Sequence, residues 1–365
     1  MSLTAGIVGL PNVGKSTLFN AITKQNILAA NYPFATIEPN VGMVTVPDER
    51  VDFLVKMYNP KKTVPATFEF TDIAGLVEGA SKGEGLGNKF LSHIREVDAI
   101  CEVVRCFDDS NITHVSGNID PIRDVEVINV ELELADLEVV ENRISRMGKK
   151  ARLANDKEAM KELNLLEKVK DNLEKNIPLR NLDLSKEEKL ILKPFNLLTL
   201  KPIIYVANVD ENNISEDNDY ILKLKEYAKK ENAEVVKISA KIEEELVELS
   251  DIEKKEFLND LGIEESGLDK LIKSSYKLLG LKTFLTSGTD EVRAWTFKDG
   301  MTAPECAGII HTDFQRGFIK AEIMSYKDLK ELGSELKVKE NGKLRLEGKD
   351  YIMQDGDICH FRFNV

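Results

Sequence analysis

Residues 9–16 read Gly9-Leu10-Pro11-Asn12-Val13-Gly14-Lys15-Ser16, which matches the pattern G-x-x-x-x-G-K-[ST] of a phosphate-binding loop. The apolar residues 5–8 precede the loop and predict a strand, and residues 17–23 follow it with a helical pattern. This context matters because backbone N–H groups at a helix N-terminus bind phosphate oxygens. Lys15 would reach the β- and γ-phosphates and Ser16 would hold Mg²⁺. The stretch therefore predicts an α/β P-loop nucleotide-binding domain with a mostly parallel sheet.

A second motif, Asp72-Ile73-Ala74-Gly75, follows the alternating residues 66–71 and fits D-x-x-G. It would bring the Asp72 carboxylate close to Mg²⁺ and a glycine N–H close to the γ-phosphate. Thr36 lies between the two motifs and would reach the metal only when a γ-phosphate is bound; the alternative is a plain loop threonine. Because the two motifs occur together, we favour a segment that switches with the nucleotide state.

The position that orients the attacking water in many GTPases has an unusual residue in this sequence. Leu76 follows Gly75, at the place where many GTPases have the glutamine that orients the attacking water. Leucine cannot hydrogen-bond water, so hydrolysis is expected to be slow or to use a polar group from elsewhere. His114, after the strand-like residues 99–107, is one candidate, since imidazole can orient water near neutral pH. A surface or capping histidine explains it equally well.

The purine-recognition segment is expected at Asn208-Val209-Asp210-Glu211, directly after the strand-like residues 202–207. GTPases usually have N-K-x-D there, with the Asp carboxylate bonded to guanine. Here Val209 replaces the lysine and Glu211 extends its carboxylate by one methylene, so the guanine contact is misplaced. Adenine loses nothing by this change, and we therefore predict that ATP is preferred to GTP. The loop Ser239-Ala240-Lys241, after a strand at 235–238, is expected to complete the base site.

The rest of the chain predicts two further domains. Apolar residues at helical spacing between 121 and 199 predict a helical hairpin, interpreted either as an arm for a partner or as a solvated helix pair. Gly148 and a basic stretch lie between the two helical patterns, where the turn is expected. The basic stretch is a candidate RNA contact: Arg143, Arg146, Lys149, Lys150 and Arg152. Short alternating stretches between turns predict a small β-rich domain over 281–365. The nucleotide domain then comprises 1–120 and 200–280.

Composition and charge exclude several classes of protein. The chain has 365 residues, too many for one typical core, and two or three domains are expected. No apolar run approaches the roughly 20 residues needed to span a bilayer, and the first residues lack a signal-peptide pattern, so a cytoplasmic protein is expected. The net charge of −13 argues against general polyanion binding. We expect neither DNA nor a membrane as a partner.

These motifs together resemble the YchF subfamily of Obg-like P-loop ATPases. The resemblance covers the whole length, since three C-terminal stretches look like that family's TGS domain, a β-grasp module: residues 294–297, 310–314 and 355–357. It implies nucleotide contacts from Asn12, Val13, Gly14, Lys15, Ser16, Thr17, Asn208, Val209 and Glu211, to which the strand pattern above adds Ser239 and Ala240. It implies metal ligands from Ser16 and Thr36, to which the D-x-x-G motif adds Asp72. It also implies His114 as the residue that orients water, and Lys15 of the phosphate loop is the second catalytic candidate.

The resemblance also implies a function. It predicts an ATPase that needs Mg²⁺, associates with ribosomes and is linked to translation and stress responses. In related GTPases an asparagine at the position of Asn12 serves a potassium ion, so K⁺ is a second candidate cofactor; the alternative is a loop-stabilising asparagine. Two other functions stay open: a GTPase of ribosome assembly, and a nucleotide-stabilised scaffold in which hydrolysis is incidental.

Overall fold

The computed structural model describes residues 3–29, 40–73, 86–109, 118–154 and 156–364, and these residues pack as two compact units. Of the described residues, those within 1–28, 36–43 and 69–275 form the first unit, and those within 29–35, 44–68 and 276–365 form the second. Residues 44–68 thus pack with the C-terminal part of the chain. The domain boundaries drawn from the sequence stay a prediction.

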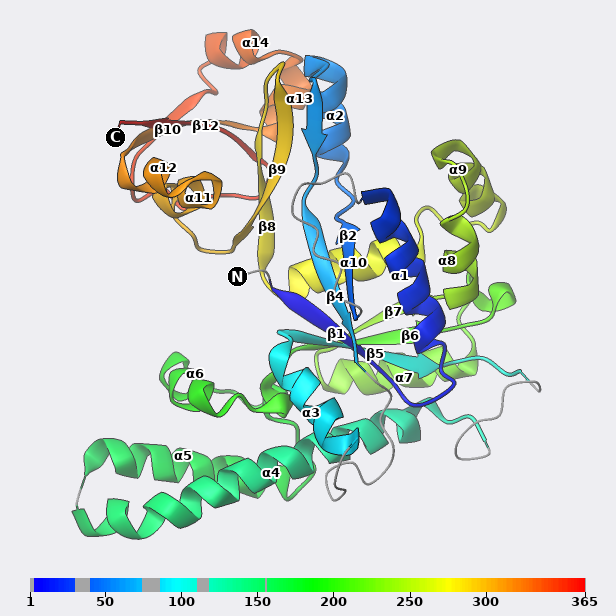
Figure 1. Cartoon of the computed structure of the whole chain (residues 1–365), viewed down its shortest axis with the longest axis vertical. Helices are drawn as coiled ribbons and strands as arrows, with labels where there is room; N and C mark the ends of the chain where they lie inside the picture. Colours follow the sequence, from blue (N-terminus) through cyan, green and yellow to red (C-terminus); the bar gives the residue numbers. More distant parts are fainter. Residues whose placement is uncertain (1–2, 30–39, 74–85, 110–117, 155, 365) are drawn as a thin grey trace. The chain divides into compact units, whose positions relative to one another are not determined.

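The first unit is built on a six-stranded sheet with the order β2-β4-β1-β5-β6-β7 (Figure 1). Its strands are β1 (Thr4–Val8), β2 (Val41–Thr45), β4 (Thr67–Asp72), β5 (Ala99–Arg105), β6 (Ile203–Asn208) and β7 (Glu234–Ile238). The pairs from β4 through β1, β5 and β6 to β7 are all parallel. Both β5 and β6 are buried along their whole length, and both are mostly apolar rather than alternating, with Glu102 and Arg105 as the charged exceptions in β5.

Helices and short 3₁₀ turns connect these strands. The helices are α1 (Lys15–Ala29), α3 (Leu86–Glu96), α4 (Pro121–Ala154), α5 (Lys157–Leu173), α6 (Lys186–Leu192), α7 (Asp219–Lys230), α8 (Ala240–Leu246), α9 (Asp251–Asp260) and α10 (Gly267–Leu278). The 3₁₀ turns are η1 (Leu179–Asn181), η2 (Lys193–Phe195), η3 (Leu198–Leu200) and η4 (Glu211–Asn213). Because β4, β1, β5, β6 and β7 run parallel, their carboxyl ends meet at one edge, where α/β proteins bind ligands.

The predicted helical hairpin is present, with α4 and α5 side by side (Figure 1). Leu165, Leu166 and Val169 of α5 pack with Val140 of α4 in a buried apolar cluster. The turn differs from the prediction, because α4 runs through Gly148 to Ala154 and the basic stretch forms its last turns. One glycine costs a helix about 1 kcal/mol, which is too little to end it.

Buried hydrogen bonds fix the base of this hairpin. Asp136 of α4 is fully buried and accepts the backbone N–H groups of Leu198 and Thr199, each at 2.8 Å. Its carboxylate also accepts the Thr199 hydroxyl at 2.7 Å. The chain returning from the hairpin toward β6 is therefore tied directly to α4.

The second unit is a six-stranded mixed sheet with the order β11-β10-β12-β8-β9-β3. Its elements are α2 (Glu49–Tyr58), β3 (Lys62–Val64), β8 (Leu281–Thr286), β9 (Glu291–Lys298), α11 (Ala303–Ile310), α12 (Thr312–Arg316), β10 (Phe318–Ser325), α13 (Tyr326–Leu332), α14 (Glu335–Glu340), β11 (Arg345–Glu347) and β12 (Asp357–Phe363). A β8–β9 hairpin lies beside β12, which pairs with β8 in parallel. Together with the first unit, this arrangement confirms the predicted fold class.

The N-terminal half of the chain contributes to this second sheet. Strand β3 pairs in parallel with β9, from Lys62 opposite Glu291 to Val64 opposite Arg293. Arg50 of α2 donates to Asp355 at 2.7 Å, and Phe53 packs edge-on against Tyr326. No helix among the described residues is long and apolar enough to cross a membrane.

Candidate functional site

The phosphate loop joins β1 to α1 and uses a left-handed backbone at two positions. Asn12 has φ of +66° and Gly14 has φ of +93°. The first helical hydrogen bond runs from the Leu18 N–H to the Gly14 carbonyl at 3.0 Å. A Cβ atom on Gly14 would lie 2.1 Å from the amide nitrogen of Asn208. Glycine is therefore required here for its backbone angle and for the space it leaves.

Asn208 ends β6 and links the phosphate loop to α8. Its side chain is 4% exposed; the amide nitrogen donates to the Val13 carbonyl at 2.8 Å, and the amide oxygen accepts the Ala240 N–H at 3.0 Å. The sequence predicted a nucleotide contact for Asn208. The structure adds a supporting role, because one side chain holds the loop and the start of α8 together.

Lys15 and Asp72 lie next to each other at the start of α1. Asp72 ends β4 opposite Ile7 of β1, and its carboxylate forms an ion pair with the Lys15 ammonium. Ser16 follows Lys15, and both residues line a cavity that is described below. A serine hydroxyl and a carboxylate are the hard oxygen ligands that Mg²⁺ prefers, so these residues fit a magnesium ion. The third predicted ligand, Thr36, lies outside the described residues.

The segment after β6 forms the other end of the site. Val209 is buried and its N–H donates to the Ile238 carbonyl at 2.8 Å. The Asp210 carboxylate accepts the backbone N–H groups of Asn212 and Asn213 at 2.9 and 3.0 Å, so it caps η4. Glu211 forms an ion pair with Lys241 at 2.5 Å, and this hydrogen bond raises the pKa of Lys241. Both carboxylates after Val209 thus have local partners.

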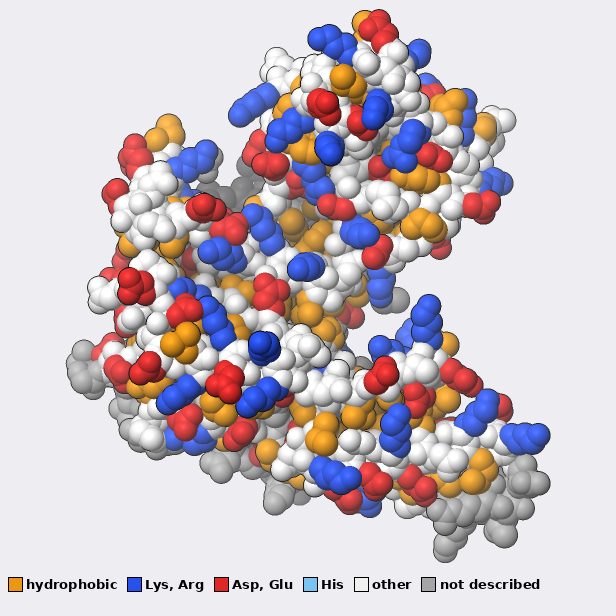
Figure 2. Space-filling model, turned by 180° about the vertical axis from the view of Figure 1, so that it is seen from behind, with side chains coloured by type: hydrophobic (Ala, Val, Ile, Leu, Met, Phe, Trp, Pro, Cys, Tyr) orange, Lys and Arg blue, Asp and Glu red, His pale blue; other side chains and the backbone are white. Residues whose placement is uncertain are grey.

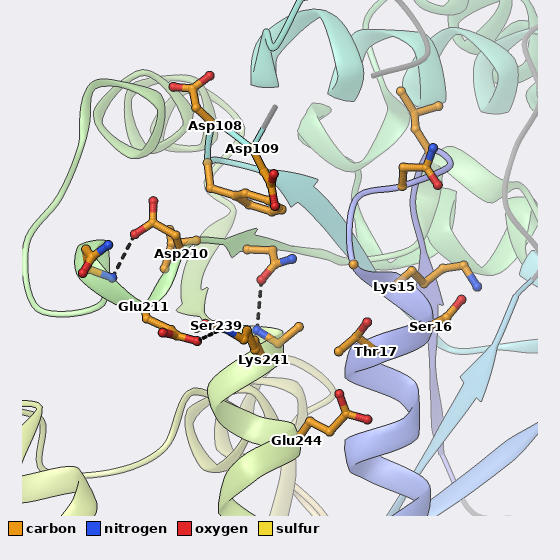
Figure 3. A pocket seen from close by; sticks show the side chains of 18 of the residues that line it. Lys15, Ser16, Thr17, Asp108, Asp109, Asp210, Glu211, Ser239, Lys241 and Glu244 are labelled. Atoms are coloured by element: carbon orange, nitrogen blue, oxygen red, sulfur yellow. Dashed lines mark hydrogen bonds and ion pairs between the residues drawn. The ribbon is translucent and has the colours of Figure 1, made fainter. Parts of the chain in front are cut away.

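These residues surround a cavity of about 1040 Å³ (Figure 3). Figure 3 shows Lys15, Ser16 and Thr17 at the N-terminal end of α1, across the cavity from Glu211 and Lys241. The predicted nucleotide-binding residues that line it are Asn12, Gly14, Lys15, Ser16, Thr17, Asn208, Val209, Glu211, Ser239 and Ala240. Val13 does not line it; its carbonyl accepts the Asn208 amide instead.

Several lining residues were missed by sequence reasoning. Phe107, Asp108 and Asp109 follow β5, and Glu244 belongs to α8, whereas Lys241, which also lines the cavity, lies in the expected base-contact loop. The signal was available for the first three, because a segment directly after a parallel strand reaches the same sheet edge as its neighbours. Lys15 and the N-terminus of α1 are attractive to anions, so a ligand with an anionic end is expected to place that end there.

Ser239 is a further polar group at the wall of the cavity. It is 1% exposed, and its hydroxyl has no hydrogen-bond partner among the described residues. A buried hydroxyl without a partner is unfavourable, which makes it a candidate ligand contact. Of the other predicted catalytic and switch residues, Gly75, Leu76 and His114 lie outside the described residues.

Comparisons with known proteins agree over the whole chain. Residues 281–364 match the family model YchF-GTPase_C, described as a protein of unknown function (DUF933), and residues 4–143 match a model described as 50S ribosome-binding GTPase. The "Ribosome-binding ATPase YchF" of Bacillus subtilis is 61% identical over 367 residues, and that of Haemophilus influenzae is 56% identical over 365; both alignments cover 100% of each chain. The solved structure of the Schizosaccharomyces pombe YchF GTPase has a TM-score of 0.90 at 43% identity, covering 99% of this chain and 98% of that one.

Proposed function

The chain belongs to the YchF family, and from this premise we propose that it is a ribosome-associated ATPase that binds Mg²⁺-ATP in the cavity described above. ATP is preferred to GTP and is hydrolysed slowly. The nucleotide acts as a conformational switch linked to translation and the stress response, in the cytoplasm. The curated relatives are called ribosome-binding ATPases, which supports the reaction and the partner.

One observation carries the base preference: both carboxylates that could accept hydrogen bonds from guanine are already engaged. Asp210 caps η4, and Glu211 pairs with Lys241. Guanine would have to break one of these interactions to form its own hydrogen bonds to a carboxylate, whereas adenine does not need a carboxylate acceptor. Buried Val209 offers apolar contact in place of the usual lysine stem.

The phosphates are assigned to the α1 end of the cavity. Backbone N–H groups from Gly14 to Thr17 bind the phosphate oxygens there. When the nucleotide binds, the Lys15 ammonium leaves the Asp72 carboxylate and pairs with the β- and γ-phosphates. Magnesium, held by Ser16 and Asp72, would neutralise charge on the phosphates. Lys15 stabilises the charge that develops as the γ-phosphate leaves, and His114 orients water. Asn12 would help to hold a K⁺ ion. Replacing potassium with sodium in a hydrolysis assay tests this, because the rate should fall if K⁺ is used.

The test of base preference is calorimetry of the purified chain with Mg²⁺-ATP and Mg²⁺-GTP. We expect tighter ATP binding, by about tenfold or more, since a lost charged hydrogen bond costs roughly 1.5–3 kcal/mol. The double substitution Val209→Lys with Glu211→Asp restores N-K-x-D and should move the preference toward GTP, while Glu211→Gln should not. Tighter binding of GTP by the unsubstituted chain would refute the assignment.

A GTPase remains the second candidate. The solved relative from Schizosaccharomyces pombe is called a GTPase, and the matched N-terminal model describes a ribosome-binding GTPase. This reading keeps the phosphate chemistry and changes only the base. The same calorimetric competition separates the two.

Ribosome binding is tested by co-sedimentation with ribosomes, with and without ATP, at two salt concentrations. The last turns of α4 hold the basic stretch and are the candidate RNA contact. Figure 2 shows basic and acidic side chains interspersed over the face in view, so a local contact is expected rather than a broad basic surface. A contact to RNA phosphates weakens steeply with salt. Binding that is independent of both salt and ATP would contradict a switch that acts through RNA.

A further inference from the structure

A buried arginine lies directly behind one wall of the nucleotide cavity. Arg105 is the last residue of β5, pairs in register with Asn208 of β6, and is 1% exposed. Guanidinium stays charged at all working pH values, and burying it is unfavourable unless its N–H groups are bonded. Its partners therefore indicate what Arg105 holds in place.

Two partners of the Arg105 side chain belong to the cavity wall. The Arg105 Nε donates to the Phe107 carbonyl at 3.2 Å, and one terminal nitrogen donates to the Asp109 carbonyl at 3.1 Å. The guanidinium carbon also lies 4.7 Å from the centre of the Phe107 ring. One planar group thus fixes two carbonyls and one ring of residues 107–109. A lysine ammonium, as a point charge, could not make this set of contacts.

The same wall is held from the side of β6 and α7. The Cys106 N–H donates to the Asn208 carbonyl at 2.8 Å, and the Asn218 amide donates to the Cys106 carbonyl at 2.8 Å. The Tyr220 hydroxyl donates to the Asp108 carboxylate at 3.2 Å. Residues 106–109 are therefore fixed relative to the segment that the proposed function assigns to the purine.

Phe107 makes this wall relevant to the base. It is half-buried and lines the cavity, as do Asp108 and Asp109. An aromatic ring in a cavity can stack on a nucleobase, and such stacking is worth about 1–3 kcal/mol per base. That gain depends on a ring already held in place, because ordering a free side chain on binding reduces it.

We propose that Arg105 is a positioning residue for the purine: it fixes Phe107 and the 107–109 wall against which the base packs. This inference rests on the proposed nucleotide site but not on the choice between ATP and GTP. It assigns Arg105 to the base end alone, so the phosphate loop should bind its anion without it.

The test compares a nucleotide with its phosphate part. Arg105→Lys and Arg105→Met are each titrated with Mg²⁺-ATP and, separately, with inorganic tripolyphosphate plus Mg²⁺. If the unsubstituted chain binds GTP rather than ATP, Mg²⁺-GTP replaces Mg²⁺-ATP. We expect nucleotide affinity to fall about tenfold, while tripolyphosphate affinity changes less than about twofold. Arg180→Lys is the matched control, because the Arg180 side chain is also only 7% exposed but donates to Asn129 and Glu231, neither of which lines the cavity. It should leave both affinities unchanged.

A double-mutant cycle tests whether Arg105 acts through the ring. In a Phe107→Ala background, Arg105→Lys should cause little further loss of nucleotide affinity, since the stacking it supports is already gone. An equal fall in nucleotide and tripolyphosphate affinity, unchanged nucleotide affinity, or full additivity with Phe107→Ala would each overturn the proposal. If no purine nucleotide binds the unsubstituted chain more tightly than tripolyphosphate does, both this inference and the proposed function fail. Failure of Arg105 alone leaves the proposed function intact.

Discussion

Gly14→Ala should damage the phosphate loop in a way that depends on Asn208. An alanine at φ of +93° costs about 1–2 kcal/mol in backbone strain. Its Cβ, 2.1 Å from the Asn208 amide nitrogen, would also displace that amide from the Val13 carbonyl. Losing this buried hydrogen bond adds about 1–3 kcal/mol. We therefore expect Gly14→Ala to reduce the free energy of unfolding by about 2–5 kcal/mol and to weaken tripolyphosphate binding.

The partner substitution separates the two contributions. In an Asn208→Ala background the clash and the hydrogen bond are both absent, so Gly14→Ala should cost only the backbone strain. Urea unfolding of the four chains, without nucleotide, gives the coupling energy, which we expect to be about 1–3 kcal/mol. Gly262→Ala is the matched control, because Gly262 has a similar φ of +70° but nothing within 4 Å of its Cβ position. If Gly14→Ala costs the same with and without the Asn208 amide, the reasoning is wrong.

Three further predictions concern pH, the helical hairpin and turnover. Burial raises the pKa of Glu243 to about 7 from 4.5, although the Gly267 N–H favours its charged form. The Glu243 carboxyl therefore stabilises the fold fully below pH 4.5, and about 3 kcal/mol of the free energy of unfolding is lost as the pH rises through 7. Glu243→Gln should remove this pH dependence of the free energy of unfolding, measured with urea. If the pH dependence is unchanged in the variant, another group causes it. Asp136→Ala leaves the buried backbone N–H groups of Leu198 and Thr199 without their carboxylate acceptor. We expect the free energy of unfolding to fall by about 2–5 kcal/mol and hydrogen exchange at these two N–H groups to become faster. Exchange at the rate of the unsubstituted chain would show that Asp136 does not anchor the hairpin. His114→Ala should lower ATP turnover at nearly unchanged ATP affinity, and an unaltered rate would remove His114 from the mechanism.

The parts of the fold that local sequence determines were predictable. The glycine spacing of residues 9–16 indicated a strand, a loop and a helix, and β1 and α1 flank the loop as expected. The helical spacing after residue 121 indicated the hairpin, and the turn signals after 281 indicated a β-rich sheet. In each case the pattern repeats within a few residues, so no distant partner is needed to interpret it.

The features that sequence reasoning missed depend on distant partners. Strand β3 is only three residues long, and its place beside β9 follows from pairing with residues more than two hundred positions away. The position of Phe107 after a strand indicated the carboxyl edge of the sheet, but its place beside the Asn208 segment also depends on β5 and β6 being neighbours in the sheet. Gly148 suggested a turn because isolated glycines often mark one, but the packing of α4 on α5 outweighs its low helix propensity.

The two ends of the cavity are mechanically joined, and this bears on how a nucleotide could act as a switch. Asn208 bonds to the phosphate loop through Val13 and to the start of α8 through Ala240, while its own carbonyl accepts the Cys106 N–H of the Arg105-supported wall. A site connected in this way is already organised for the base and the phosphates, so it has little of its own to rearrange when a nucleotide binds. A signal that distinguishes ATP from its hydrolysis product must then arise where the γ-phosphate is sensed. On the proposed assignment of the phosphates, that point includes Lys15 and Asp72, because a phosphate that binds the Lys15 ammonium would release the Asp72 carboxylate at the end of β4.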